Sequence, residues 1–206
     1  MVVRVTIFDY GAGNLHSLAK ALESDGVVVA VESDPLQSID TDVLVLPGVG
    51  AFGAAVERLA SGRDAMRDAI RGGLPTIGIC LGMQLLFDSS DEGSGAGLGI
   101  IPGHVTRLQA QCVPQIGWNE VLPKDDDPLF AEAPLSIAYY ANSFVCRPTN
   151  ESAVIAWTTH EGDRFPAAVR EGRAVGVQFH PEKSSAHGVR FLHAFLRDAQ
   201  RTGAIK

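Results

Sequence analysis

The first half of the sequence alternates short apolar runs with longer segments of helical periodicity, and few folds accommodate that pattern. Strand-like runs are expected near Val3–Phe8, Val27–Val31, Val43–Leu46 and Thr76–Ile79. Helices are expected near Leu15–Glu23 and Val56–Arg71. Because strands separated by helices pair in parallel, the alternation predicts a parallel sheet covered on both faces.

The second half contains short strands in succession. They are expected near Val105–Leu108, Ser136–Tyr140, Ala153–Trp157, Ala167–Val169 and Ala174–Phe179. The run Arg170–Arg173 is a good hairpin turn, so antiparallel pairs are added to the sheet. A final helix is expected near Ala186–Gln200. The predicted fold is α/β, with a mixed, mostly parallel central sheet.

Length and composition indicate a single domain. The chain has 206 residues, 46% of them hydrophobic, which is enough for a full core. It opens directly into a strand pattern without the features of a signal peptide, and no apolar stretch is long enough to span a bilayer. We therefore expect one domain over residues 1–206 in the cytoplasm.

Several classes of binding site are not expected. The three cysteines are widely spaced and form no Cys-x-x-Cys pair, which argues against disulfides and structural zinc. The histidines have no ligand spacing for another metal, and the run Gly11–His16 lacks the third glycine of a dinucleotide site. A net charge of −7 without a basic cluster disfavours nucleic acid. We predict neither metal nor cofactor.

Cys80 stands in the run Gly78-Ile79-Cys80-Leu81-Gly82, between a strand-like and a helix-like segment. A lone cysteine in an apolar setting is more often an inert core residue. Here, however, glycines two residues on either side suit a sharp strand-to-helix turn that exposes a nucleophile. The start of a helix also favours the thiolate, the reactive form of the side chain.

A second pair of chemically active residues follows a later strand-like run. His180 and Glu182 come directly after Phe179, at a predicted strand end. Ligands of open α/β sheets gather beyond the carboxyl ends of the strands, so Cys80 and this pair are expected to converge. His180 would take the thiol proton and Glu182 would orient the imidazole.

The glycine-rich segment Pro47–Gly53 also follows a predicted strand. Attack of a thiolate on a carbonyl produces an oxyanion that needs N–H donors. The candidates are the N–H of Leu81 and one from Val49-Gly50. An equally good interpretation of the segment is a tight turn between a strand and a helix, and local sequence does not decide between them.

Together these motifs resemble the class I (triad) glutamine amidotransferases, which have a three-layer fold. The further runs Asp9–Leu15, Pro47–Phe52, Ile116–Asn119 and His180–Ser184 resemble the glutaminase subunits of imidazole glycerol phosphate synthase. The resemblance implies a thioester of glutamine on Cys80 and a heterodimer with a cyclase subunit. That partner would use the ammonia to make imidazole glycerol phosphate and aminoimidazole carboxamide ribotide in histidine biosynthesis.

The resemblance also implies roles for other residues. Gln84 and Glu92 match glutamine-binding positions. The ordinary alternatives are that Gln84 is a helix-surface residue and that Glu92 is a loop charge. Asn142, Ser143 and Phe144 match a strand that holds the glutamine, but Asn142 stands where the family usually has histidine. Asparagine hydrogen-bonds but does not titrate near neutral pH. The positions matching the subunit interface and ammonia passage are Asn14, Trp118 and Lys183, and Trp118 alone would suggest a core aromatic.

Two other enzymatic interpretations remain open. One is a glutaminase subunit of another class I pathway, which the Ile116–Asn119 run argues against. The other is a free cysteine hydrolase, which should be active without a partner. A non-catalytic binding subunit is a third possibility, but such a protein has no physical need for Cys80, His180 and Glu182 together.

Overall fold

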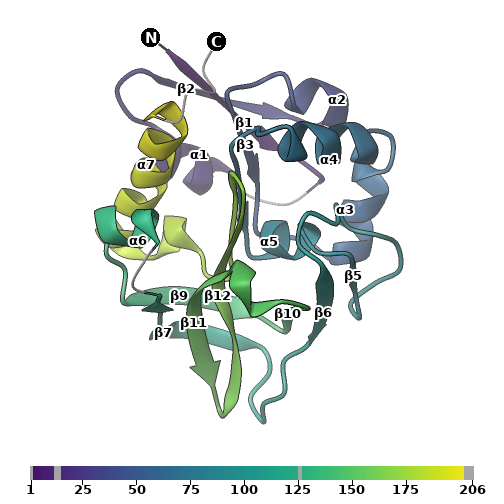
Figure 1. Ribbon diagram of the computed structural model, residues 1–206, viewed down its shortest axis with the longest axis vertical. Helices are drawn as coiled ribbons and strands as arrows, with labels where there is room; N and C mark the ends of the chain where they lie inside the picture. Colours follow the sequence, from purple (N-terminus) through teal and green to yellow (C-terminus); the bar gives the residue numbers. More distant parts are fainter. Residues whose placement is uncertain (1, 12–14, 125–126, 202–206) are drawn as a thin grey trace.

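The computed structural model describes residues 2–11, 15–124 and 127–201, and its centre is an eight-stranded sheet (Figure 1). The strand order is β2-β1-β3-β4-β13-β12-β11-β8. The parallel strands are β1 (Val3–Phe8), β2 (Val27–Glu32), β3 (Val43–Leu46), β4 (Thr76–Ile79) and β13 (Ala174–Val177). The antiparallel strands are β12 (Asp163–Glu171), β11 (Val154–His160) and β8 (Leu122–Pro123). The predicted mixed, mostly parallel sheet is confirmed.

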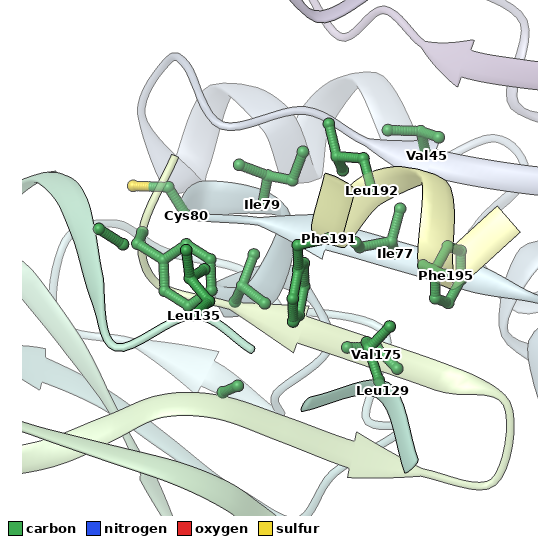
Figure 2. Close-up of a cluster of buried hydrophobic side chains, with 14 of the residues drawn as sticks. Val45, Ile77, Ile79, Cys80, Leu129, Leu135, Val175, Phe191, Leu192 and Phe195 are labelled. Atoms are coloured by element: carbon green, nitrogen blue, oxygen red, sulfur yellow. The ribbon is translucent and has the colours of Figure 1, made fainter. Parts of the chain in front are cut away.

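Helices cover both faces of this sheet, as expected. One face carries α1 (His16–Leu22), α6 (Pro128–Glu132) and α7 (Ser185–Arg201), and the other carries α2 (Pro35–Ser38), α3 (Phe52–Leu59), α4 (Arg63–Arg71) and α5 (Leu81–Leu85) (Figure 1). Successive strand residues point to opposite faces of the sheet, so they pack in two separate hydrophobic cores. Val45 and Ile77 pack with Phe191 of α7 (Figure 2), whereas Leu44 packs with Phe52 of α3. No helix in the described ranges is both long and apolar enough to cross a membrane.

Two smaller sheets lie outside the central one, which corrects the sequence prediction. A three-stranded sheet joins β10 (Phe144–Pro148), β6 (Gly103–Arg107) and β5 (Ser89–Ser90), and a two-stranded sheet joins β7 (Gln115–Glu120) and β9 (Ile137–Asn142). The strands expected near residues 105–108 and 136–140 therefore do not extend the main sheet. Buried residues alternate with more exposed ones along β9, whereas β3 and β4 are buried on both faces. This pattern suits a sheet with one open face.

The helix expected over residues 56–71 is two helices, α3 and α4. The break is at Gly62, the N-cap position of α4. A Cβ atom there would lie 2.8 Å from the Pro35 Cβ and Cγ atoms of α2. Only glycine fits against Pro35 at this point, where one helix has ended and the next begins. Helical periodicity continues across the break, so by itself it predicted one long helix. A further 3₁₀ turn occupies Glu151–Ala153, so β11 begins one residue later than expected.

The turn from β4 into α5 needs glycine at two positions, as the sequence predicts. A Cβ atom on Gly78 would lie 2.4 Å from the Gly82 carbonyl oxygen, and one on Gly82 would lie 2.0 Å from the Leu46 carbonyl oxygen. Both distances are far inside van der Waals contact. The first turn of α5 therefore packs directly on the end of β3, with no loop between β4 and Cys80.

Substitution Gly82→Ala should lower the free energy of unfolding by at least about 2 kcal/mol, because the new methyl group overlaps the Leu46 backbone. Gly53→Ala is the matched control. Gly53 lies within α3, and its Cβ would approach other atoms no closer than 3.7 Å. The control should leave stability unchanged or raise it by up to about 1 kcal/mol. Urea denaturation of both variants measures this, and equal effects would contradict the contact.

Candidate active site

Cys80 occupies a backbone conformation that few non-glycine residues adopt. Its φ is 48° and its ψ is −102°, and it is the N-cap residue of α5. Its N–H donates to the Val177 carbonyl at 2.7 Å, which fixes the turn to β13. Figure 2 shows Cys80 at the edge of the core cluster, with its sulfur pointing away from the labelled apolar side chains. Strained, non-glycine positions of this kind concentrate at functional sites.

The His180 imidazole is held between Glu182 and Cys80. His180 Nδ1 lies 2.8 Å from Glu182 Oε1, which leaves Nε2 free to face another group. A Cβ atom placed on Gly48 would lie 2.9 Å from the His180 ring and 3.1 Å from Cys80 Cβ. The ring and the thiol-bearing carbon therefore flank the same glycine. The structure thus brings together Cys80, His180 and Glu182.

The charge on His180 follows from these neighbours. Burial alone would lower the pKa of the imidazole, because it disfavours the charged form. The hydrogen bonds and negative charges of Cys80 and Glu182 outweigh burial and raise the pKa of His180 to about 9. The ring is therefore an imidazolium at neutral pH. The Cys80 sulfur therefore has a hydrogen-bonding cation beside it.

A cavity of about 300 Å³ opens beside the sulfur. Its wall includes the predicted oxyanion and glutamine-binding residues together with Cys80 and His180, whereas Glu182 lies behind the imidazole. The cavity is lined by Gly48, Val49, Gly50, Cys80, Leu81, Gln84, Glu92, Ala141, Asn142, Ser143, Phe144, His180 and Lys183. Sequence segments far apart in the chain therefore meet at one small polar cavity.

The segment between β3 and α3 is both a tight turn and part of the cavity wall. Gly50 has a φ of 118°, in the region that favours glycine. A Cβ atom there would lie 3.4 Å from Leu81 Cδ2, so this segment runs against the start of α5. The N–H of Leu81 belongs to the first turn of that helix and has no intrahelical acceptor. The two alternatives left open by the sequence are therefore compatible.

Gln84 and Asn142 meet at one backbone carbonyl. Both side chains are buried, and both donate to the Phe144 carbonyl oxygen, at 3.2 Å each. Gln84 is therefore not a helix-surface residue. The Asn142 Oδ1 atom is buried and accepts no hydrogen bond from any described residue. One amide oxygen is thus left unpaired behind the wall of the cavity.

Glu92 caps a helix from within the same wall. Its Oε2 atom accepts the Phe52 N–H at 3.0 Å, at the start of α3. A carboxylate at this end of a helix interacts favourably with the helix dipole. Glu92 is therefore more than a loop charge, because it ties the wall of the cavity to α3.

The outer face of β7 and β9 carries exposed apolar side chains. Trp118 is 53% exposed and contacts the Tyr139 ring edge-on, at 6.2 Å between ring centroids. The Lys183 ammonium lies 6.0 Å from the centroid of the same Tyr139 ring. Ile116 and Ile137 on these two strands are also exposed. We call these residues the β7/β9 face. Trp118 is not a core aromatic, and Asn14 lies outside the described residues.

Sequence reasoning missed the part that the β9 backbone plays at the site. The Tyr139 carbonyl accepts the His180 N–H at 2.8 Å, and the Ala141 carbonyl lies 3.9 Å from Cys80 Sγ. Ser184 connects the same elements, because its hydroxyl accepts from the Tyr139 N–H and donates to the His180 carbonyl. The strand pattern near Tyr139 and the resemblance at Asn142–Phe144 both pointed to this strand. Neither predicted the contacts of its backbone with His180 and Cys80, because main-chain contacts leave no residue-type signal.

Comparison with known proteins agrees with the fold and with the sequence motifs. Residues 6–199 match the family described as Glutamine amidotransferase class-I. A solved glutamine amidotransferase superposes with a TM-score of 0.72 at 20% identity, covering 95% of this chain and 98% of that one. PurLQS from Thermotoga maritima superposes with a TM-score of 0.69, also at 20% identity, covering 96% and 99%. The expected three-layer class I fold is therefore confirmed.

Sequence relatives narrow the assignment. The imidazole glycerol phosphate synthase subunit HisH of Symbiobacterium thermophilum is 46% identical over 196 residues, covering 93% of this chain and 92% of the relative. The same subunit of Halobacterium salinarum is 42% identical over 201 residues, with the same coverage of both chains. By both comparisons, this chain belongs to the glutamine amidotransferase class-I family and, within it, to the group of HisH subunits.

Proposed function

We propose that this chain is the glutaminase subunit of imidazole glycerol phosphate synthase. It hydrolyses glutamine to glutamate and ammonia and delivers the ammonia to a cyclase subunit, which makes imidazole glycerol phosphate and aminoimidazole carboxamide ribotide. The observation that carries the proposal is the strained Cys80 beside the His180–Glu182 pair, at the wall of a cavity of about 300 Å³. The HisH relatives supply the pathway.

The first half of the reaction forms a thioester. The Cys80 thiolate attacks the carboxamide carbon of glutamine, and the carbonyl becomes an oxyanion. When the C–N bond breaks, the imidazolium of His180 donates its proton to the leaving nitrogen, which departs as ammonia. Glu182 holds the ring in the required orientation through Nδ1.

The second half removes glutamate from the sulfur. His180, now neutral, takes a proton from a water molecule that attacks the thioester carbon. The C–S bond then breaks, which releases glutamate and restores the thiolate–imidazolium pair. In both halves, the oxyanion is bound by the N–H of Leu81 and by one N–H of Val49 or Gly50. One such donor contributes about 3 kcal/mol in the transition state.

Glutamine is bound by Gln84, Glu92 and the segment Asn142–Phe144, all of which line the cavity. Within that segment, the Asn142 Nδ2–H donates to the Phe144 carbonyl oxygen at 3.2 Å and holds the strand in place. Because asparagine does not titrate near neutral pH, this contact is independent of pH where a histidine would not be.

The cyclase subunit docks on the β7/β9 face, with Trp118 as its central contact and Lys183 beside it. A large exposed aromatic ring next to apolar side chains is typical of a protein interface. The same β9 strand contacts His180 and Cys80 through its backbone carbonyls. Docking can therefore affect the site directly.

The three cysteines are free, which fits the reducing cytoplasm we propose for the heterodimer.

A single assay separates this function from its alternatives. Glutamate release is measured with the chain alone, and then with the cyclase subunit and its ribonucleotide ligand. Strong stimulation by the pair supports the proposal. Full activity of the chain alone would identify a free cysteine hydrolase. Stimulation only by the partner of another amidotransferase pathway would identify the other subunit class.

Substitution Cys80→Ala should abolish glutamate release, with a residual rate below about one thousandth, because no other described group can form the thioester. Association with the cyclase should be unchanged, since the sulfur faces the cavity rather than the β7/β9 face. Cys112→Ala, which changes an exposed cysteine, is the control and should retain full activity. Retained turnover in Cys80→Ala would refute the assignment of the nucleophile.

Substitution Glu182→Gln should lower the pKa of His180, because it removes a charge that stabilises the imidazolium. The folded pKa of His180, about 9, exceeds its ordinary value of about 6.5. Its contribution to stability is therefore full below pH 6.5 and lost as the pH rises through 9. The destabilisation caused by Glu182→Gln should accordingly be larger at pH 6 than at pH 10, by urea denaturation. Glu57→Gln on α3 is the control, and a pH-independent difference for Glu182→Gln would contradict the pairing.

Substitution Trp118→Ala should weaken association with the cyclase at least about tenfold, because a buried aromatic contact is removed from the interface. Stability should change by less than about 0.5 kcal/mol, since the ring is largely exposed. Val31→Ala is the matched control, an exposed apolar residue on strand β2. Calorimetric titration with the cyclase measures the affinity of both variants, and urea denaturation measures their stability. Equal affinities for the two variants would place the interface elsewhere.

A further inference from the structure

Gln178 is a buried amide that reaches the reactive sulfur. It follows β13 directly, and its N–H donates to the Ala167 carbonyl at 2.9 Å, which continues the pairing with β12 beyond the strand end. The side chain is fully buried. Its Nε2 atom lies 3.5 Å from Cys80 Sγ and donates to it. The amide therefore approaches the sulfur from β13, apart from the imidazole of His180.

The other end of this amide is not satisfied. Gln178 Oε1 is buried and accepts no hydrogen bond from any described residue. With nitrogen toward the sulfur, the amide can donate to Sγ in the thiol and in the thiolate form alike. The exchanged orientation could only accept from a thiol, and it would leave an N–H donor unpaired at the other end. An unpaired buried carbonyl is unfavourable, and an apolar side chain would avoid it. Packing therefore does not explain a glutamine at this position.

The surroundings of the sulfur explain what the donor does. The Ala141 carbonyl oxygen, 3.9 Å away, accepts from the Cys80 thiol, and a thiolate has no proton to donate to it. Burial raises the pKa of Tyr10 and of Cys146, and the charge of Cys80 adds to that effect, so both groups stay uncharged near it. His180 supplies a cation, and Lys183 and Glu92 are the other charged residues that line the cavity. A thiolate here gains from a donor that does not itself titrate.

We propose that Gln178 is a positioning residue that stabilises the Cys80 thiolate and fixes the direction of its sulfur through the Nε2–H···Sγ hydrogen bond. No proton is exchanged with the amide, which donates in both halves of the reaction. Stabilisation of the Cys80 thiolate concerns the protein without substrate. The effect of Gln178 on glutamine turnover rests on the proposed function as a glutaminase.

The test is the pH dependence of Cys80 alkylation in the full chain. Native protein and Gln178→Met are treated with iodoacetamide between pH 5 and 10, and each cysteine peptide is quantified by mass spectrometry. Methionine is similar in length but has no donor. The midpoint for Cys80 should rise by about one pH unit in the variant. Cys112 is exposed and reacts in the same samples, so its unchanged midpoint is the internal control.

A second variant keeps the shape of the side chain. Gln178→Glu replaces the amide by a group of the same size that, once ionised, repels the thiolate, so the Cys80 midpoint should rise further. Unchanged Cys80 midpoints in the two variants would overturn the proposal, as would equal shifts for Cys80 and Cys112. If the midpoint shifts but native protein with the cyclase does not hydrolyse glutamine, the thiolate claim stands and the proposed function fails.

Kinetics distinguish a positioning role from a general structural one. In the complex with the cyclase, Gln178→Met should lower kcat for glutamine about tenfold and change KM less than threefold, because the amide contacts the sulfur rather than the cavity wall. A rise in KM with unchanged kcat would overturn the assignment, since it would place Gln178 in substrate binding.

Discussion

The contact between α5 and the end of β3 is the constraint on which the site depends. Because Gly82 lies against the Leu46 carbonyl, the helix starts with no loop after β4, and the chain turns with Cys80 at a positive φ. That turn points the sulfur away from the core and puts the Leu81 N–H at a helix start. The strain at Cys80 is compensated by packing at two glycines.

The other groups at the sulfur come from strands that are neighbours in the sheet. β13 lies beside β4, so the chain that leaves it brings Gln178 and His180 to Cys80 from one side. The small sheet of β7 and β9 closes the site from another side, through the Tyr139 and Ala141 carbonyls. A parallel sheet with one strand order thus gathers residues nearly a hundred positions apart, such as Cys80 and Gln178.

Much of this could be predicted from the sequence. Short apolar runs predicted the bounds of β1, β3 and β4, because strands that are buried on both faces consist mainly of apolar residues. Gly78 and Gly82 identified the turn at Cys80. The break at Gly62 was missed because it depends on Pro35, distant in sequence, and the small sheets were missed because local alternation does not specify a partner. The bond from Gln178 to sulfur required coordinates, since a glutamine after a strand carries no signal of its own.

The use of β9 main-chain atoms at the catalytic groups has an evolutionary consequence. Every amino acid except proline presents the same backbone groups at positions 139 and 141, so side chains on the outer face can be exchanged without removing a contact to His180 or Cys80. In the proposed complex, recognition of the cyclase by side chains and support of the chemistry by the backbone are therefore encoded separately within one strand. A lineage that keeps this arrangement can adapt the surface to a diverging subunit while the geometry around Cys80 and His180 stays constant.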